Sequence, residues 1–386
     1  MSPKTEHCSI QCIRLCVRVQ GLAVPVSSLK TSLGQSPFDL YLPVATPHSL
    51  LVTPHYVVED HYTRDFCGLG LADNGLCLFH GSSSNDTYTL ARPLSESGPN
   101  KVWCRSQIFL FDFNKPDGDA KELELIGDVR LASPHGISLW EDKEGIQIFV
   151  VDHRLTEDTI EIFRFEPPLS LRHTRTIHNP LFANLNDVIA TGDSSFYVTN
   201  VASVRDGPLL TISFLLQLST GSVVYYDGVT ARQVAGNGKI LNGITSSSDG
   251  RFIFVSYMVD EAIVVFRREG DGSLMRVQTI SLSAIPDNLF YDPATGDLLA
   301  SCGIPIGFFT MITDYGHKAP SHLLRIRPLS GERRDNPFET YNIVELFADD
   351  GNLLSVSSSA ALFQDKLLLG SVLEKAALCE IKYAND

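Results

Sequence analysis

The stretch LNGITSSSDGRFIFVS (residues 241–256) contains the pattern that decides the fold of this chain. It begins with a polar residue, Asn242, ahead of a short apolar segment. A Ser-Asp-Gly turn signal follows at 248–250. The next residues, RFIFVSYM (251–258), are mostly apolar and read as a strand with side chains alternating between its two faces. Such alternation is typical of β-strands. The stretch therefore predicts two successive strands, the first of which starts at a polar side chain.

Three more stretches share this pattern of a polar residue before a short strand. They are PHGIS (134–138), LNDVI (185–189) and PDNLF (286–290). The starts recur about every fifty residues, and each is followed by a second and usually a third and fourth strand. A four-stranded unit with this period is typical of a propeller blade. Similar starts at 69–81 and 353–363 bring the set to six. We therefore predict an all-β fold, a six-bladed β-propeller with a central channel.

The chain of 386 residues divides into two parts in this interpretation. Residues 51–386 form the propeller. Residues 1–50 form an N-terminal segment, for which we expect a closing outer strand and otherwise irregular chain. The strand is expected because Ile13, Leu15 and Val17 alternate with other residue types, as the buried face of a strand would.

Composition and charge limit the partners. The formal net charge is −14, from 31 Lys and Arg against 45 Asp and Glu, which argues against a nucleic-acid partner. No apolar run is long enough for a transmembrane helix. Arg14 and Arg18 interrupt the apolar part of the N-terminus, which makes it a poor signal peptide. We therefore expect a cytoplasmic protein without a nucleic-acid or membrane partner, and a homo-oligomer is compatible with the sequence.

The eight cysteines are not densely spaced, so we expect free thiols, as in a reducing compartment. The alternative is a zinc site. Cys8, Cys12 and Cys16 are four residues apart and would share one face of a helix, but a fourth ligand is missing.

The innermost strand of every blade lines the channel of a propeller, so the first residues of these strands should meet at one mouth. These residues are His135, Asn186, Asn242, Asp287 and Asn288. Converging amide and carboxylate oxygens are the ligands that a hard cation such as calcium requires. The alternative is that Asn and Asp before strands are only turn formers. Their recurrence in phase favours a shared role in the channel.

The chain resembles the paraoxonase/arylesterase family of six-bladed propellers, which belongs with the gluconolactonase-like and strictosidine-synthase-like propellers. The resemblance covers about residues 65–383 and depends on the order and spacing of several stretches. They include SPHGISLWED (133–142), VVDHRLTEDTIEIFRFE (150–166), NLNDVIATG (184–192), PDNLFYDPATGDLLASCG (286–303) and LLLGSVLEKAALCEI (367–381).

The resemblance implies two calcium ions in the channel. The ligands of the catalytic ion would be Asn186, Asn242, Asp287 and Asn288. The structural ion would be bound by Asp187 and by the backbone carbonyl of Ile137. His135 and His153 would be the histidine pair that activates water, while calcium polarises the ester carbonyl as a Lewis acid.

One departure from the family concerns charge. The family has a Glu-Asp pair, one residue for each calcium, ahead of its first Asn-Gly-Leu. Aligning residues 74–76 with that motif places Cys67 and Gly68 at these positions. An opposite charge at ~4 Å is worth about 4 kcal/mol at an effective dielectric of 20, so a lost carboxylate weakens calcium binding by orders of magnitude. A register shift that recruits Asp65 (or Glu59 or Asp60) is the alternative.

We therefore expect no cofactor, with calcium in the channel as the alternative, and interpret five residues as vestigial calcium ligands. They are Asn186, Asp187, Asn242, Asp287 and Asn288.

A second departure concerns the apolar character of the mouth. The stretch CGIPIGFFTM (302–311) is apolar where the family has a polar His-Pro-Asn. It indicates a small apolar substrate, and the apolar insert at 197–218 points the same way, with core or subunit packing as its alternative. The family's N-terminal cysteine, which pairs with the one matching Cys379, has no clear counterpart. The expected substrate-binding residues are Ile304, Phe308, Phe309, Val372 and Leu373.

Three functions follow, in order of preference. The first is a metal-independent pericyclase of secondary metabolism, because the chain is similar to fungal hetero-Diels–Alderases that join a tropolone quinone methide to a sesquiterpene such as humulene. Such an enzyme acts mainly by orienting its reactants. The alternatives are a calcium-dependent lactonase or arylesterase and a non-catalytic propeller that binds a small molecule or a protein. The expected catalytic residues are His135, His153, Asn186, Asn242, Asp287 and Asn288.

Overall fold

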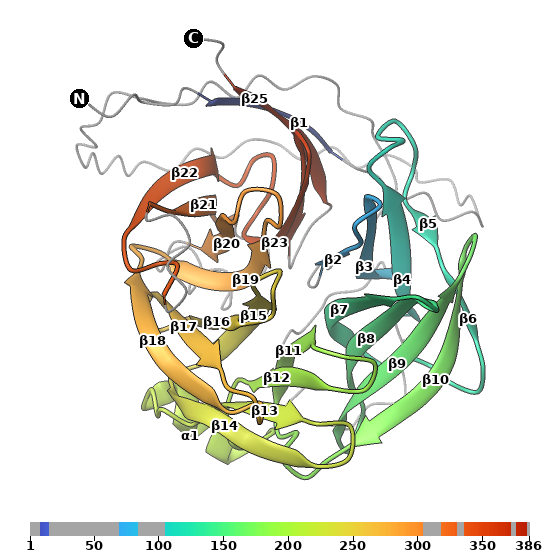
Figure 1. Ribbon diagram of the computed structural model, residues 1–386, viewed down its shortest axis with the longest axis vertical. Coiled ribbons are helices and arrows are strands. Elements are labelled where there is room, and N and C mark those ends of the chain that lie inside the picture. Colours follow the sequence, from blue (N-terminus) through green and yellow to red (C-terminus); the bar gives the residue numbers. More distant parts are fainter. Residues whose placement is uncertain are drawn as a thin grey trace, which may run out of the picture.

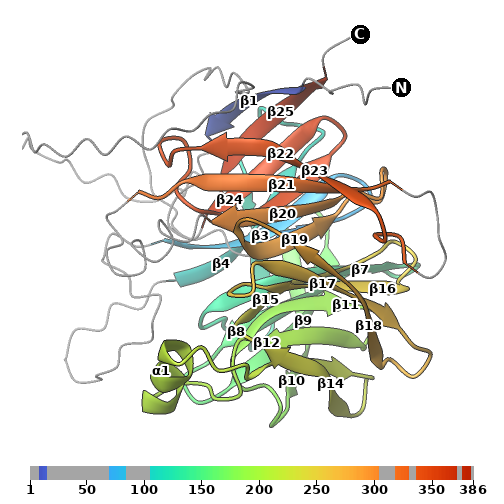
Figure 2. The same ribbon diagram turned by 90° about the vertical axis from the view of Figure 1, so that its left-hand side faces the viewer.

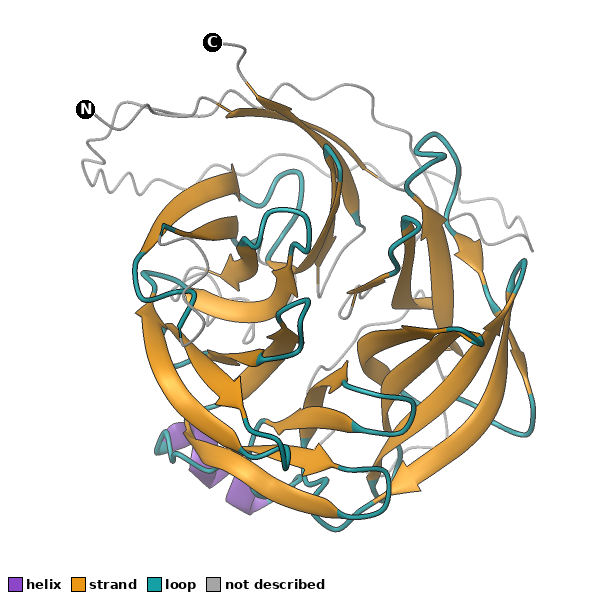
Figure 3. Ribbon diagram, viewed as in Figure 1, coloured by secondary structure: helices purple, strands orange, loops and turns teal. Residues whose placement is uncertain are grey.

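Six small sheets form a ring in the computed structural model, and each sheet is one blade (Figure 1). Residues of all six sheets line a cavity in the central channel. The structure describes residues 8–14, 69–83, 105–303, 318–329, 336–371 and 376–383. Strands and loops make up nearly all of this part of the chain (Figure 3). The predicted six-bladed β-propeller is confirmed.

The strands of each blade follow one another from the channel outward. Blade 1 contains β2 (Leu69–Leu71), β3 (Leu76–Ser83), β4 (Arg105–Asp112) and β5 (Lys121–Glu122). Blade 2 contains β7 (Pro134–Asp142), β8 (Gly145–His153), β9 (Asp158–Glu166) and β10 (Ser170–His178), with β6 (Glu124–Ile126) at its outer edge. Blade 3 contains β11 (Leu185–Ala190), β12 (Phe196–Asn200), β13 (Gly221–Tyr226) and β14 (Ala231–Gly238).

The other three blades continue the series. Blade 4 contains β15 (Leu241–Ser246), β16 (Phe252–Tyr257), β17 (Ala262–Arg268) and β18 (Leu274–Ser281). Blade 5 contains β19 (Ile285–Tyr291), β20 (Leu298–Gly303), β21 (Ser321–Pro328) and β22 (Tyr341–Asp349). Blade 6 contains β23 (Ser357–Phe363), β24 (Lys366–Ser371) and β25 (Ala377–Tyr383), with β1 (Cys8–Arg14) outermost.

The blades are held together by an apolar core at each contact between neighbours. In β16, Phe252 and Phe254 belong to the core shared with blade 5, whereas Ile253 and Val255 belong to the core shared with blade 3. Successive side chains of a strand point to opposite faces, so a strand buried on both faces is almost wholly apolar. Burying one such side chain contributes about 1.5–3 kcal/mol.

The last blade is completed by a strand from the opposite end of the chain. β1 pairs antiparallel with β25 (Figure 1). The register of the pair places Cys12 directly opposite Cys379. Cys379 is disulfide-bonded, so the expectation of free thiols is wrong for this residue. Cys12 lies in a strand rather than on a helix, which removes the helical basis of the zinc hypothesis. A disulfide is typical of proteins in an oxidising environment.

The apolar insert of blade 3 forms a helix between β12 and β13. α1 (Pro208–Leu215) lies at one end of the blade, clear of the strands (Figure 2). Its apolar side chains Leu209, Ile212 and Leu215 are exposed, so the alternative of ordinary core is wrong for this part of the insert. It holds for the start of the predicted insert, where Tyr197 and Val198 of β12 are buried. None of the helices in the described ranges is long and apolar enough to cross a bilayer.

We expect Cys379→Ser to lower the free energy of unfolding by about 2–4 kcal/mol, because the disulfide limits the freedom of the unfolded chain. Urea unfolding of the variant and of the wild type measures the difference. A reductant should lower the urea midpoint of wild-type unfolding to that of the variant, and it should leave the midpoint of the variant unchanged. Equal wild-type midpoints with and without reductant would contradict the prediction.

Candidate functional site

The inner strands of four blades begin with the same irregularity. The pairing register shifts between Pro134 and Ile137 in β7, and at the corresponding places in β11, β15 and β19. Such bulges bend a strand and change the direction of its side chains. The residues inside them are the polar residues that the sequence motifs begin with: His135, Asn186, Asp187, Asn242, Asp287 and Asn288.

Two glycines in these motifs allow neighbouring inner strands to approach closely. A Cβ atom at Gly136 would lie 2.5 Å from the Cα of Asp187, and one at Gly243 would lie 2.5 Å from the Cα of Asn288. Only glycine fits such a backbone approach. The two glycines therefore allow the polar residues at the starts of neighbouring inner strands to lie close together.

Hydroxyl groups on the second strands hold the inner strands of the following blade. Thr199 of β12 donates a hydrogen bond of 2.6 Å to the backbone oxygen of Asn242, and Ser256 of β16 donates one of 2.6 Å to the backbone oxygen of Asp287. Sequence reasoning missed both residues, although each is a hydroxyl residue near the end of its strand. They fix the backbone from which the polar side chains enter the channel.

Two amide oxygens at the site are buried without a partner. Asn186 Nδ2 lies 3.4 Å from Nε2 of His135, and Asn242 Nδ2 donates to Sδ of Met258 at 3.0 Å. Both side-chain oxygens lack a hydrogen bond. An unsatisfied buried acceptor costs about 1–3 kcal/mol, so these oxygens suit a ligand from outside the chain.

Two buried carboxylates lie beside these amides. Burial raises the pKa of Asp187 to about 7, although its carboxylate accepts hydrogen bonds from the backbone N–H groups of Val188 and Ile244. Burial and the neighbouring Asp187 raise the pKa of Asp287 to about 8. A cation would relieve both costs.

The donor set suits calcium better than zinc. Within the described ranges, no three His, Cys, Asp or Glu side chains group closely enough to hold a metal by themselves. Amide and carbonyl oxygens must therefore complete any coordination, and calcium accepts such ligands. The channel continues below the polar residues as a cavity of about 160 Å³, which Asp187 and Asn288 line together with residues of all six inner strands.

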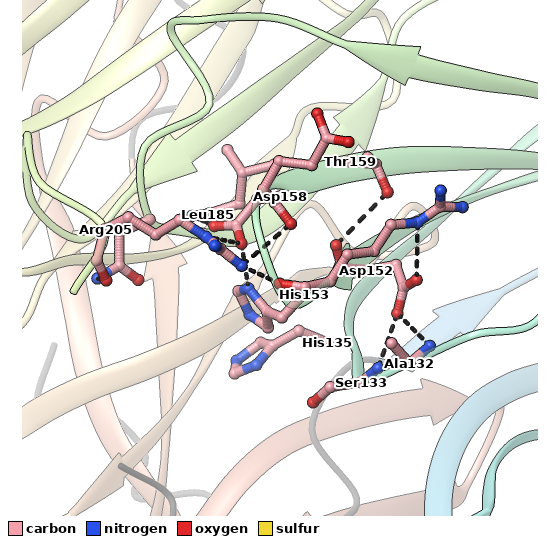
Figure 4. A network of polar contacts seen from close by, with 12 residues as sticks. Ala132, Ser133, His135, Asp152, His153, Asp158, Thr159, Leu185 and Arg205 are labelled. Carbon is pink, nitrogen blue, oxygen red and sulfur yellow. Dashed lines mark hydrogen bonds and ion pairs between the residues drawn. The ribbon is translucent and has the colours of Figure 1, made fainter. Parts of the chain in front are cut away.

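The two histidines lie against each other at the mouth. The rings of His135 and His153 are 5.3 Å apart and meet edge to face, at 82°. His153 ends β8, and its Nδ1 lies 3.1 Å from Oδ1 of Asp158 (Figure 4). Burial opposes ionisation of Asp158, but hydrogen bonds from His153, Leu185 and Arg205 lower its pKa to about 2. An ionised Asp158 accepts the Nδ1–H of His153 and leaves Nε2 as the basic nitrogen.

The structure brings together the predicted polar residues His135, His153, Asn186, Asp187, Asn242, Asp287 and Asn288 through these contacts and charges. The five predicted substrate-binding residues lie outside the described residues, and so do Cys67 and Gly68. Asp158 and Arg205 were not predicted. Asp158 could have been found from the hairpin register, which places it opposite His153, whereas nothing in the sequence pointed to Arg205.

Comparison with known proteins gives a consistent result. Residues 100–381 match the family model described as Arylesterase. The chain is 34% identical over 279 residues to serum paraoxonase/arylesterase 2 of Gallus gallus, covering 71% of this chain and 77% of that protein. It is 34% identical over 280 residues to serum paraoxonase/lactonase 3 of Rattus norvegicus, with coverage of 71% and 77%.

Among solved structures, the chain is similar to the aldose sugar dehydrogenase of Streptomyces coelicolor. The TM-score is 0.50 at 14% identity, and the match covers 83% of this chain and 95% of that one. At this identity the similarity shows a shared fold alone.

Burial of Asp287 predicts an unusual pH dependence of stability. The pKa of about 8 exceeds the ordinary value of 3.8, so the folded state keeps a proton that the unfolded chain loses. In a chelator, stability should therefore fall as the pH rises from about 4 towards 8. We expect Asp287→Asn to melt like the wild type near pH 5 and a few degrees higher near pH 9.

Melting curves recorded in the chelator across this range test the prediction. Asp73→Asn, which changes an exposed carboxylate, is the matched control and should follow the wild type. If the melting temperatures of Asp287→Asn and the wild type changed with pH in parallel, burial of Asp287 would not disfavour its ionised form.

Proposed function

The chain belongs to the arylesterase family, and on that basis we propose that it is a calcium-dependent hydrolase of esters or lactones. The observation that carries the proposal is the pair of unpartnered amide oxygens, on Asn186 and Asn242, beside two buried carboxylates. The relatives that share about a third of its sequence are named as arylesterases and lactonases.

In this proposal four residues would hold the catalytic calcium ion, which when bound polarises the substrate carbonyl as a Lewis acid. They are Asn186, Asn242, Asp287 and Asn288. Asp187 would serve the second ion. We propose this role in place of the vestigial one that the sequence suggested, because oxygens without a partner are costly to keep unless a ligand uses them.

The histidine pair supplies the proton transfer. His153 takes a proton from water at Nε2, since its Nδ1–H is held by Asp158. His135 packs edge to face on the ring and restricts its rotation. A positioned base of this kind contributes roughly 10²–10⁴-fold to a rate. The resulting hydroxide attacks the acyl carbon, and the alcohol leaves with the proton that His153 returns.

The substrate is proposed to be small and apolar. The residues proposed to contact it remain Ile304, Phe308, Phe309, Val372 and Leu373. An apolar mouth favours aryl esters and lactones with alkyl chains over charged substrates.

A metal-free pericyclase is the second candidate. The sequence observation that favours it is the replacement of the family's first-blade Glu-Asp pair by Cys67 and Gly68, together with the apolar stretch at 302–311. The hetero-Diels–Alderase reaction between a tropolone quinone methide and a sesquiterpene would use the same amides and imidazoles to orient its reactants. We rank it second because the named relatives are hydrolases.

We expect the purified protein to hydrolyse phenyl acetate or an aliphatic lactone with calcium present, and to lose this activity in a chelator. Added calcium should restore the activity and raise the melting temperature. Cyclisation of a tropolone quinone methide with humulene in the chelator, without ester or lactone turnover, would instead support the pericyclase.

His153→Gln should lower kcat at least 100-fold and leave the calcium-induced rise in melting temperature intact, because His153 is not one of the proposed ligands. His178→Gln is the matched control, since His178 is half exposed and pairs with Glu157 at 2.9 Å. Unchanged turnover in His153→Gln would exclude His153 as the base.

A further inference from the structure

A carboxylate in the β8–β9 hairpin contacts both parts of the proposed site. Asp158 is 1% exposed and lies directly across the hairpin from His153. Its Oδ1 is 3.1 Å from Nδ1 of His153, and its Oδ2 accepts a hydrogen bond of 2.9 Å from the backbone N–H of Leu185. Leu185 immediately precedes Asn186, so one carboxylate fixes the histidine relative to the inner strand of the next blade.

An arginine from the blade 3 insert holds this carboxylate in place. Nε of Arg205 donates to Oδ1 of Asp158 at 3.0 Å. Its remaining N–H groups donate to the backbone oxygens of Leu155 at 3.0 Å, of Glu157 at 3.1 Å and of Arg154. The guanidinium thus binds the carboxylate and the turn that carries it. Arginine suits this role because its planar group presents donors in a fixed arrangement.

We propose that Asp158 and Arg205 are positioning residues for His153, Asp158 by accepting its Nδ1–H and Arg205 by fixing Asp158 and the β8–β9 turn. This inference rests on the proposed hydrolytic function. In this proposal both residues act through His153. Figure 4 shows the ring of His135 on the side of His153 opposite to Asp158, so the hydrogen bond to Asp158 orients His153 towards its partner histidine.

The proton balance explains why a carboxylate belongs at this place. When water loses a proton to Nε2, His153 becomes an imidazolium and hydroxide adds to the acyl carbon. Asp158 stabilises that imidazolium and keeps the second nitrogen protonated throughout, as in other His–carboxylate pairs of hydrolases. The C–O bond then breaks, and the leaving alcohol takes the proton back from Nε2. Hydrogen bonds from His153, from the backbone N–H of Leu185 and from Arg205 together keep Asp158 ionised, consistent with the low pKa of that carboxyl.

A purely structural role is the competing explanation, and two matched controls represent it. Asp297 is a buried carboxylate paired with Arg327 at 3.0 Å in blade 5. Arg175 bridges blades 2 and 3 away from His153, donating to the hydroxyl of Tyr226 at 2.9 Å. Asp297→Asn and Arg175→Met remove comparable polar contacts without touching the histidine.

The test compares steady-state kinetics on phenyl acetate with calcium present. Asp158→Asn should lower kcat about 100-fold, change KM less than about threefold and move the acid limb of the kcat/KM profile to lower pH, because the charge that favours imidazolium is gone. Arg205→Met should lower kcat about tenfold, and Arg205→Lys should recover part of the loss. The control variants should retain kcat within about twofold. An unchanged pH profile in Asp158→Asn, or equal losses in the controls, would overturn the proposal.

A second measurement separates this inference from the proposed function. Nitrogen-15 NMR of histidine-labelled protein, with His153→Gln for assignment, reports which ring nitrogen of His153 carries the proton. The neutral ring should be protonated at Nδ1 in the wild type and should change in Asp158→Asn. Absence of ester and lactone turnover with Nδ1 protonated would remove the proposed function and keep the hydrogen-bond assignment. Protonation at Nε2 in the wild type would overturn the positioning role itself.

Discussion

The burial of two carboxylates in one channel is the constraint on which this site depends. Asp187 and Asp287 are almost wholly buried, and burial raises the pKa of each well above that of a free carboxyl. Repulsion from Asp187 raises the pKa of Asp287 further. A protein keeps such groups only where they are protonated, hydrogen-bonded or paired with a cation. Backbone N–H groups compensate part of the cost at Asp187. The unpartnered oxygens of Asn186 and Asn242 add to the cost, which is typical of a site kept for function rather than for stability.

The propeller remains stable despite these unfavourable groups because the apolar cores between its blades supply most of its stability. Each contact between neighbouring blades has its own apolar core, so the polar residues at the channel occupy a small part of the buried volume. The same bulge at the start of four inner strands turns a local sequence motif into a group of converging side chains. Hydroxyl groups such as Thr199 then hold these strands at fixed positions, which a site with directional chemistry requires.

Hydrolysis and cycloaddition would make different demands on this arrangement. The proposed calcium-dependent hydrolase needs a cation for the carbonyl and a base with one defined protonated nitrogen. An orienting catalyst needs neither. The hydrogen bond from His153 to Asp158, supported by Arg205, defines the protonated nitrogen of a histidine, and this has a clear use only where a proton is transferred. The contacts of His153 therefore favour hydrolysis, the activity that the names of the relatives suggest. They give less support to cycloaddition, which the apolar stretch at 302–311 suggested.

The sequence by itself determined the six blades and most of the polar residues at the channel mouth, because a blade is specified locally by strand alternation, a turn and a polar first residue. It also indicated His153 through resemblance. Only the tertiary structure placed Asp158 and Arg205 beside His153 and Cys12 opposite Cys379. These contacts depend on hairpin register and on an insert that crosses between blades, and no local pattern encodes them. The charge state of Asp287 was likewise decided by burial and by Asp187, a neighbour one hundred residues away in the sequence.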